Sequence, residues 1–170
     1  MRIRWDPPHL AWRARNLLEL AVWSKYCAKD GQNARRLYED SGRDSRELYD
    51  KTLAFGKAGH FTSEPPSDCS KPVEEAKQDL YERARAEGID SLDEQYLNVG
   101  SAAADCGNGA HFALMNKMLS KFAHATALRI LSPRDEKLEE FQRTYFFRWG
   151  CMGFIGAFDY LERQSKALAA

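Results

Sequence analysis

The last segment of the chain constrains the fold most, because it combines a helix start with an aromatic run that has no polar face. Ser132-Pro133 is a typical helix start, and Asp135-Glu136 places acidic side chains near the positive end of the helix dipole. The expected helix extends to Leu168, and its second half is apolar on nearly every side: Tyr145, Phe146, Phe147, Trp149, Cys151, Met152, Phe154, Ile155 and Phe158. Such a helix lies at the centre of a bundle or at an oligomer interface.

Three glycines recur at intervals of three within this aromatic run: Gly150, Gly153 and Gly156. Glycine lowers helix stability, so a helix that keeps three of them needs a reason. Their spacing predicts close packing against another helix, and the alternative is a functional kink.

The rest of the chain also predicts helices. We expect helices over residues 8–28, 32–55 with a kink near Gly42, 70–88, 91–99 and 110–131, with a flexible small-residue stretch at 100–109. No β-branched alternating run and no Asn-Gly or Asp-Gly hairpin occurs between such runs. The sequence therefore predicts an all-α fold, a mostly antiparallel bundle of five or six helices in one domain over residues 1–170. Residues 56–71, rich in Gly, Pro and Ser, are expected to form a loop long enough to be mobile.

Composition excludes several classes of protein. Lys and Arg number 25 and Asp and Glu number 25, so a general electrostatic footprint for nucleic acid is missing. A local basic patch, or an enzyme that contacts few phosphates, stays open. The four cysteines are widely spaced, which disfavours a compact zinc motif, and we expect neither a metal nor a cofactor. The chain's start lacks an apolar leader and no apolar run reaches membrane-spanning length, so we expect free thiols, a cytoplasmic location and no membrane.

A charged pair interrupts the first predicted helix. Arg15 and Glu19 lie four residues apart and share one stripe with Trp12, Val22 and Tyr26. At this spacing the two side chains can pair along one helix, which contributes a few tenths of a kcal/mol if the pair is exposed. One interpretation is therefore a structural salt bridge that links helices. The other is a polar pocket in which Arg15 binds an anion and Glu19 orients it.

A second polar group lies late in the chain, where Ser120 and His124 share a face of an otherwise apolar helix. Histidine acts as a general acid or base near neutral pH, and Ser120 is one turn away. Lys117 and Lys121 flank His124 and are candidate anion-binding residues. The alternatives are a histidine satisfied by packing and lysines at a solvated edge.

These segments resemble an uncharacterised all-helical bacterial family, a domain of unknown function. The resemblance rests on Arg15-Asn-Leu-Leu-Glu19, an R-x-L-x-E start, and on Ser120-Lys-Phe-Ala-His124, a late S-x-x-x-H motif. It covers about the first 40 residues and about 15 near His124.

The arrangement is also distantly similar to HEPN domains, helical bundles found in toxin and defence ribonucleases. Their signature is an arginine, four to six residues and a histidine on one helix, and here Lys117 stands in place of that arginine. The resemblance implies a ribonuclease acting on RNA in a toxin–antitoxin or defence setting. His124 would then be the acid or base, Arg15 or Lys117 would stabilise the phosphorane, and Glu19 and Ser120 would complete the cluster.

Two other functions stay open. The first is a non-catalytic interaction protein that forms a homodimer through the aromatic last helix. The second is a small-molecule sensor with its ligand between helices near Trp12, Trp23 and Tyr26.

Overall fold

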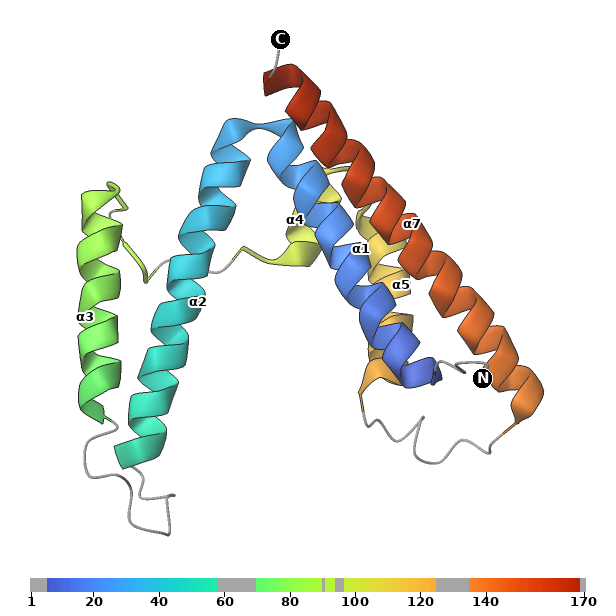
Figure 1. Cartoon of the computed structure of the whole chain (residues 1–170), viewed down its shortest axis with the longest axis horizontal. Coiled ribbons are helices and arrows are strands. Elements are labelled where there is room, and N and C mark those ends of the chain that lie inside the picture. The colour runs from blue at the N-terminus through green and yellow to red at the C-terminus, as the bar shows by residue number, and fades with distance from the viewer. Residues whose placement is uncertain (1–5, 58–69, 90, 94–96, 125–134, 169–170) are drawn as a thin grey trace. The chain divides into compact units, whose positions relative to one another are not determined.

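The computed structural model describes residues 6–57, 70–89, 91–93, 97–124 and 135–168. Within these residues the chain forms six helices and no strand (Figure 1). The helices are α1 (Pro7–Lys29), α2 (Gly31–Lys57), α3 (Ser70–Ala86), α4 (Val99–Asp105), α5 (Gly109–Ala123) and α7 (Glu136–Leu168). The prediction of an all-α fold is confirmed.

The chain divides into two compact units. The first combines Met1–Asn33 with Asn98–Ala170, and the second is Ala34–Leu97. Each is described by itself.

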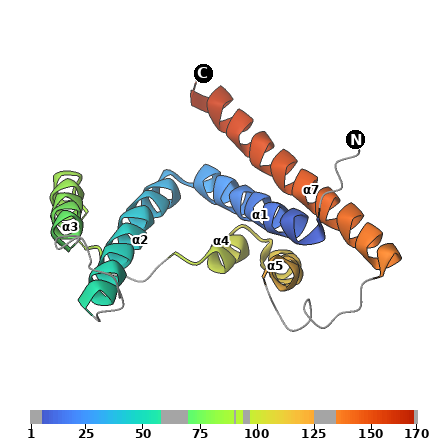
Figure 2. The same ribbon diagram turned by 60° about the horizontal axis from the view of Figure 1, so that its bottom comes forward.

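In the first unit, α1 lies between α7 and α5 (Figures 1 and 2). Gly150 and Gly153 of α7 lie against Ala14 and Leu17 of α1, so the numbering of both helices rises in the same direction and they run parallel. Lys29 Nζ, at the end of α1, donates to the carbonyl oxygen of Asp105, which precedes α5 in the chain, at 2.9 Å. Residues near the start of α1 contact the end of α5, so that pair is antiparallel, as expected for most neighbours.

The glycines of α7 let these two helices approach closely, as their spacing predicted. A Cβ atom added at Gly153 would lie 2.8 Å from the carbonyl carbon of Leu17, too close for any side chain. Small residues also line the facing side of α1, where Ala11 and Ala14 are buried. Leu119 of α5 and Phe146 of α7 complete this apolar core.

In the second unit, α2 and α3 form an antiparallel hairpin. Arg35 near the start of α2 donates to the carbonyl oxygens of Glu87 and Gly88 after α3, and Lys77 of α3 pairs with Asp50 near the end of α2. Gly88 has a φ of 69°, the left-handed conformation typical of a residue that follows a helix. α2 continues through Gly42, so the predicted break there is absent.

Three predicted boundaries were wrong. Residues 91–93 and 97–98 are not helical, and the stretch predicted to be flexible instead holds α4. The Asn98 side chain accepts a hydrogen bond from Gly100 N at 2.7 Å and caps α4, while Ala102 and Ala103 are fully buried. α5 ends at Ala123, because the next residue has an extended backbone with φ −104° and ψ 159°.

Several predictions fall outside the described residues. These are most of the loop at 56–71, the Ser132-Pro133 helix start and Cys69. The other three cysteines are free thiols: Cys27, Cys106 and Cys151. None of the described helices has the length and apolarity needed to cross a membrane.

Candidate functional site

Arg15 is the centre of a polar cluster between α1 and α5. Its Nε donates to Glu19 Oε1 and to Asn116 Oδ1, each at 3.0 Å. Its Nη1 lies 3.1 Å from His124 Nε2. The structure therefore joins the two predicted motifs, which are 109 residues apart in the sequence, through one guanidinium group.

His124 lies against the guanidinium group at the end of α5. A guanidinium group only donates, so the contact is a hydrogen bond in the tautomer whose Nε2 accepts. His124 follows α5 directly, with its backbone N–H donating to the carbonyl oxygen of Ser120 at 3.2 Å. The imidazole ring is exposed to solvent at the end of the helix.

The ion pair within the cluster is partly buried. The side chains of Arg15 and Glu19 are 29% and 26% exposed. Pairs of this kind contribute up to about 1 kcal/mol, because water competes with the partner. Both charged side chains therefore keep part of their surface in contact with solvent, where a solute can reach them.

The remaining predicted residues lie on α5. Ser120 is half-buried and lies one turn before His124. Its backbone carbonyl oxygen accepts the hydrogen bond from the backbone N–H of His124. Lys117 and Lys121 are exposed on the same helix. Sequence reasoning missed Asn116, although it lies four residues before Ser120 and hence on the same stripe, because a single asparagine on a helix has no distinctive pattern.

Metal chemistry has no obvious ligand set here. Among the residues that the structure describes, no group of three or more His, Cys, Asp or Glu side chains could hold a metal ion. The polar groups of the cluster are one cation, one carboxylate, one amide and one imidazole, and side chains of these types can bind an anion and transfer a proton.

A comparison with protein families matches residues 4–138 to a family of unknown function, DUF5677. The chain belongs to this family. The match confirms the resemblance to a family of unknown function, and Arg15, Glu19, Ser120 and His124 all fall within the matched residues. No curated protein and no solved structure matches the chain. For this DUF5677 member, the likeness to HEPN domains stays a prediction.

Proposed function

We propose that the protein is a HEPN-like ribonuclease of a toxin or defence system, with Arg15 and His124 as its central pair. The observation that supports the proposal most is the contact of 3.1 Å between Arg15 Nη1 and His124 Nε2. A guanidinium group that stabilises phosphoryl oxygens and an imidazole that takes a proton are the two groups that RNA cleavage requires.

In this mechanism, the contact between Arg15 Nη1 and His124 Nε2 opens when substrate binds. Nε2 then accepts the proton of a ribose 2′-hydroxyl while the 2′-oxygen attacks the adjacent phosphorus. The bond from phosphorus to the 5′-oxygen breaks, and the leaving oxygen takes a proton from the imidazolium or from water. The products are a 2′,3′-cyclic phosphate and a 5′-hydroxyl. Arg15 turns its donors to the phosphoryl oxygens, whose charge grows in the transition state.

Glu19 and Asn116 hold the guanidinium group in place for this step. Both accept from Arg15 Nε, while Nη1 of the same group lies against His124. Such restraint matters because a misplaced catalytic group loses much of its effect. Lys117 and Lys121, exposed on α5 near His124, would bind neighbouring phosphates.

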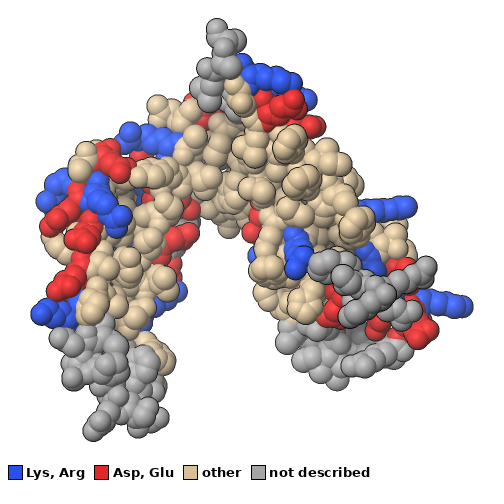
Figure 3. All heavy atoms as spheres, viewed as in Figure 1, with Lys and Arg blue, Asp and Glu red and all other residues tan. Residues whose placement is uncertain are grey.

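The neutral net charge limits how the RNA binds. With 25 basic and 25 acidic residues, the chain makes few phosphate contacts, so binding depends only weakly on salt. Figure 3 shows acidic and basic side chains interspersed rather than gathered into a single basic surface on the visible face. A small substrate site fits this pattern better than a long groove for RNA. We propose a cytoplasmic location, which suits free thiols and an RNA substrate.

The test is cleavage of a mixed RNA pool by purified wild type, His124→Ala, Arg15→Ala and Arg15→Lys. His111→Ala is the matched control, because His111 is also exposed and lies on α5, the helix that His124 directly follows. We expect wild type and His111→Ala to release 2′,3′-cyclic phosphate ends, and His124→Ala to be slower by about 100-fold or more. Arg15→Lys should restore little, because lysine lacks the bidentate fork.

Two results would reject the proposal. One is the absence of cleavage by folded wild type over a range of RNA sequences. The other is equal cleavage by wild type and His124→Ala, which would identify a contaminating nuclease.

A non-catalytic interaction protein is the second candidate, and one observation favours it. Several large apolar side chains of α7 are more than half exposed, among them Phe147, Phe154 and Phe158. Exposed apolar surface of this kind is typical of a site for another protein or another copy.

A further inference from the structure

The exposed apolar side chains of α7 follow a heptad pattern. Phe147, Cys151, Phe154, Phe158 and Leu161 are separated by four, three, four and three residues, and we call this set the α7 seam. Alternation of three and four is the spacing with which one helix packs along another over a long distance. The four seam residues other than Cys151 are between 54% and 60% exposed, although the pattern is typical of buried positions.

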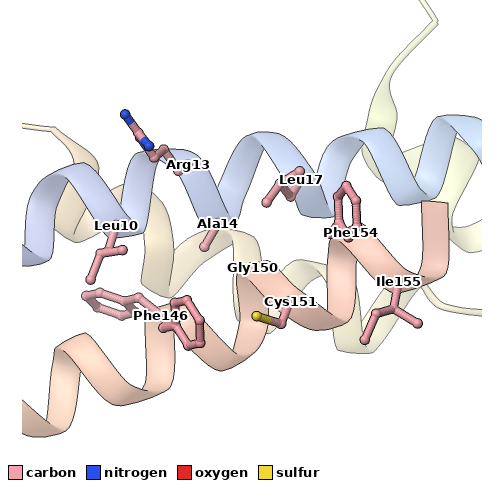
Figure 4. Close-up of a pocket in the computed structure, with 10 residues that line it drawn as sticks. Leu10, Arg13, Ala14, Leu17, Phe146, Gly150, Cys151, Phe154 and Ile155 are labelled. Atoms are coloured by element: carbon pink, nitrogen blue, oxygen red, sulfur yellow. The ribbon is translucent and has the colours of Figure 1, made fainter. Parts of the chain in front are cut away.

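A groove runs beside the α7 seam. It has a volume of about 440 Å³ and lies between α1 and α7. Figure 4 shows Leu10 and Leu17 of α1 on one side, and Phe154 and Ile155 of α7 on the other. Ala14 and Gly150, which are small, lie between them, so the helices approach closely while the larger side chains flank an open channel.

We infer that a second copy of this chain covers the groove, with its own α7 seam packed against the first. The seam and the groove lie side by side on each copy and share Phe147, Cys151 and Phe154, so the surface can pair with itself about a two-fold axis. The two α1–α7 pairs would then form a four-helix arrangement with both seams in its centre.

The area agrees with a stable dimer. Besides the seam, Ile155 of α7 and Leu20 of α1 are large apolar side chains that are nearly half or more exposed. Together with the four exposed seam residues, and at about 100 Å² for each half-exposed side chain, they offer about 600 Å² per copy. Standard stable interfaces bury about 600–1,000 Å² on each partner. Residues 149–158 of α7 include no charged side chain, and Arg13 of α1 is the charged residue among those that line the groove.

This dimer leaves the polar cluster accessible. Arg15 follows Arg13 by two residues, about 200° around the helix, and Arg13 lines the groove. Arg15 and Glu19 instead lie toward α5, where they contact Asn116 and His124. The inference is therefore independent of the proposed ribonuclease activity, and either can fail without the other.

The test is the molar mass of the full chain by light scattering and sedimentation, over a series of protein concentrations. We expect wild type to have twice the chain mass of 19.4 kDa. Phe154→Glu should raise the dissociation constant by on the order of 100-fold, because it places a charge in the centre of the interface. Leu114→Glu is the matched control, since Leu114 is 63% exposed on α5 and outside the seam.

A second variant, Phe158→Glu, guards against a folding defect in the first, and far-UV circular dichroism checks all three. A dimeric wild type that only the seam variants dissociate supports the inference. A monomeric wild type overturns the inference of a dimer, and so does a dimer that both seam variants leave intact. If the monomer binds phosphatidylcholine vesicles, the seam contacts lipid and the inference is still overturned. RNA cleavage by the same variants is measured separately, so the two proposals are judged on different readouts.

Discussion

Replacing Gly153 with alanine tests the parallel contact between α1 and α7. The new Cβ would lie 2.8 Å from Leu17 C, 2.9 Å from Leu17 O and 2.9 Å from Leu18 N. Favourable contacts between carbon atoms lie at about 3.5–4.0 Å, so α1 and α7 have to separate by several tenths of an ångström or more. Backbone atoms cannot rotate away as the end of a side chain can.

The expected free-energy change combines two opposing effects. Overpacking of a tight contact costs about 1–3 kcal/mol. Alanine in place of glycine within a helix contributes up to about 1 kcal/mol of stability. We expect Gly153→Ala to lower the free energy of unfolding by about 1–2 kcal/mol, which corresponds to a fall in Tm of about 2–8 °C for a chain of this size.

Gly156→Ala is the matched control on the same helix. Its Cβ would lie 3.7 Å from Ala21 Cβ, an ordinary contact, so the helix effect alone remains. We expect this variant to be more stable than wild type by about 0.5–1 kcal/mol. Thermal and urea unfolding followed by circular dichroism measures both. Changes of the same sign in the two variants would refute the close parallel contact.

Two further predictions concern the second unit. Asp40→Ala should lower the free energy of unfolding of this unit by about 3 kcal/mol, as measured by urea unfolding. The variant removes the carboxylate beside the buried Arg43, and it removes the oxygen that accepts from Leu97 N at 2.9 Å. Burial raises the pKa of Asp44 above its ordinary value of 3.8, and the charges of Asp40 and Glu47 add to the effect. The charged form is thus disfavoured on folding, so Asp44→Asn should raise Tm at pH 7, and this gain should vanish as the pH falls below about 3.8. An equal gain at pH 3 and pH 7 would contradict the second prediction.

Helix caps and breakers predicted most of the fold, and the errors share a cause. The segment at 100–109 was predicted to be flexible because it is rich in Gly, Ser and Ala. Alanine favours a helix as well, and burial decides between the two outcomes: Ala102 and Ala103 are fully buried. Burial is a tertiary property, so local composition could not show it. The parallel direction of α1 and α7 was equally hidden, because it follows from contacts such as Gly153 with Leu17, which lie far apart in the sequence.

The site was predicted unevenly for a related reason. Arg15 and Glu19 are four residues apart on one helix, so the sequence predicts their contact directly. The contact of Arg15 with His124 depends on the antiparallel packing of α1 and α5, and the sequence offered it only as a hypothesis about a shared cluster. Asn116 had no signal of its own and was identified only by its bond to Arg15.

The exposure of the cluster separates its structural and catalytic interpretations. The Arg15–Glu19 pair remains partly exposed and contributes up to about 1 kcal/mol, so Arg15→Ala should leave the chain folded. A catalytic loss of about 100-fold is worth about 2.7 kcal/mol in the transition state and cannot arise from so small a change in folding. If Arg15→Ala and His124→Ala keep the Tm of wild type within a few degrees and lose RNA cleavage, the cluster acts on substrate. If either variant unfolds instead, the contacts of Arg15 between α1 and α5 stabilise the fold by more than a partly exposed ion pair can explain. The structural interpretation of the cluster then holds.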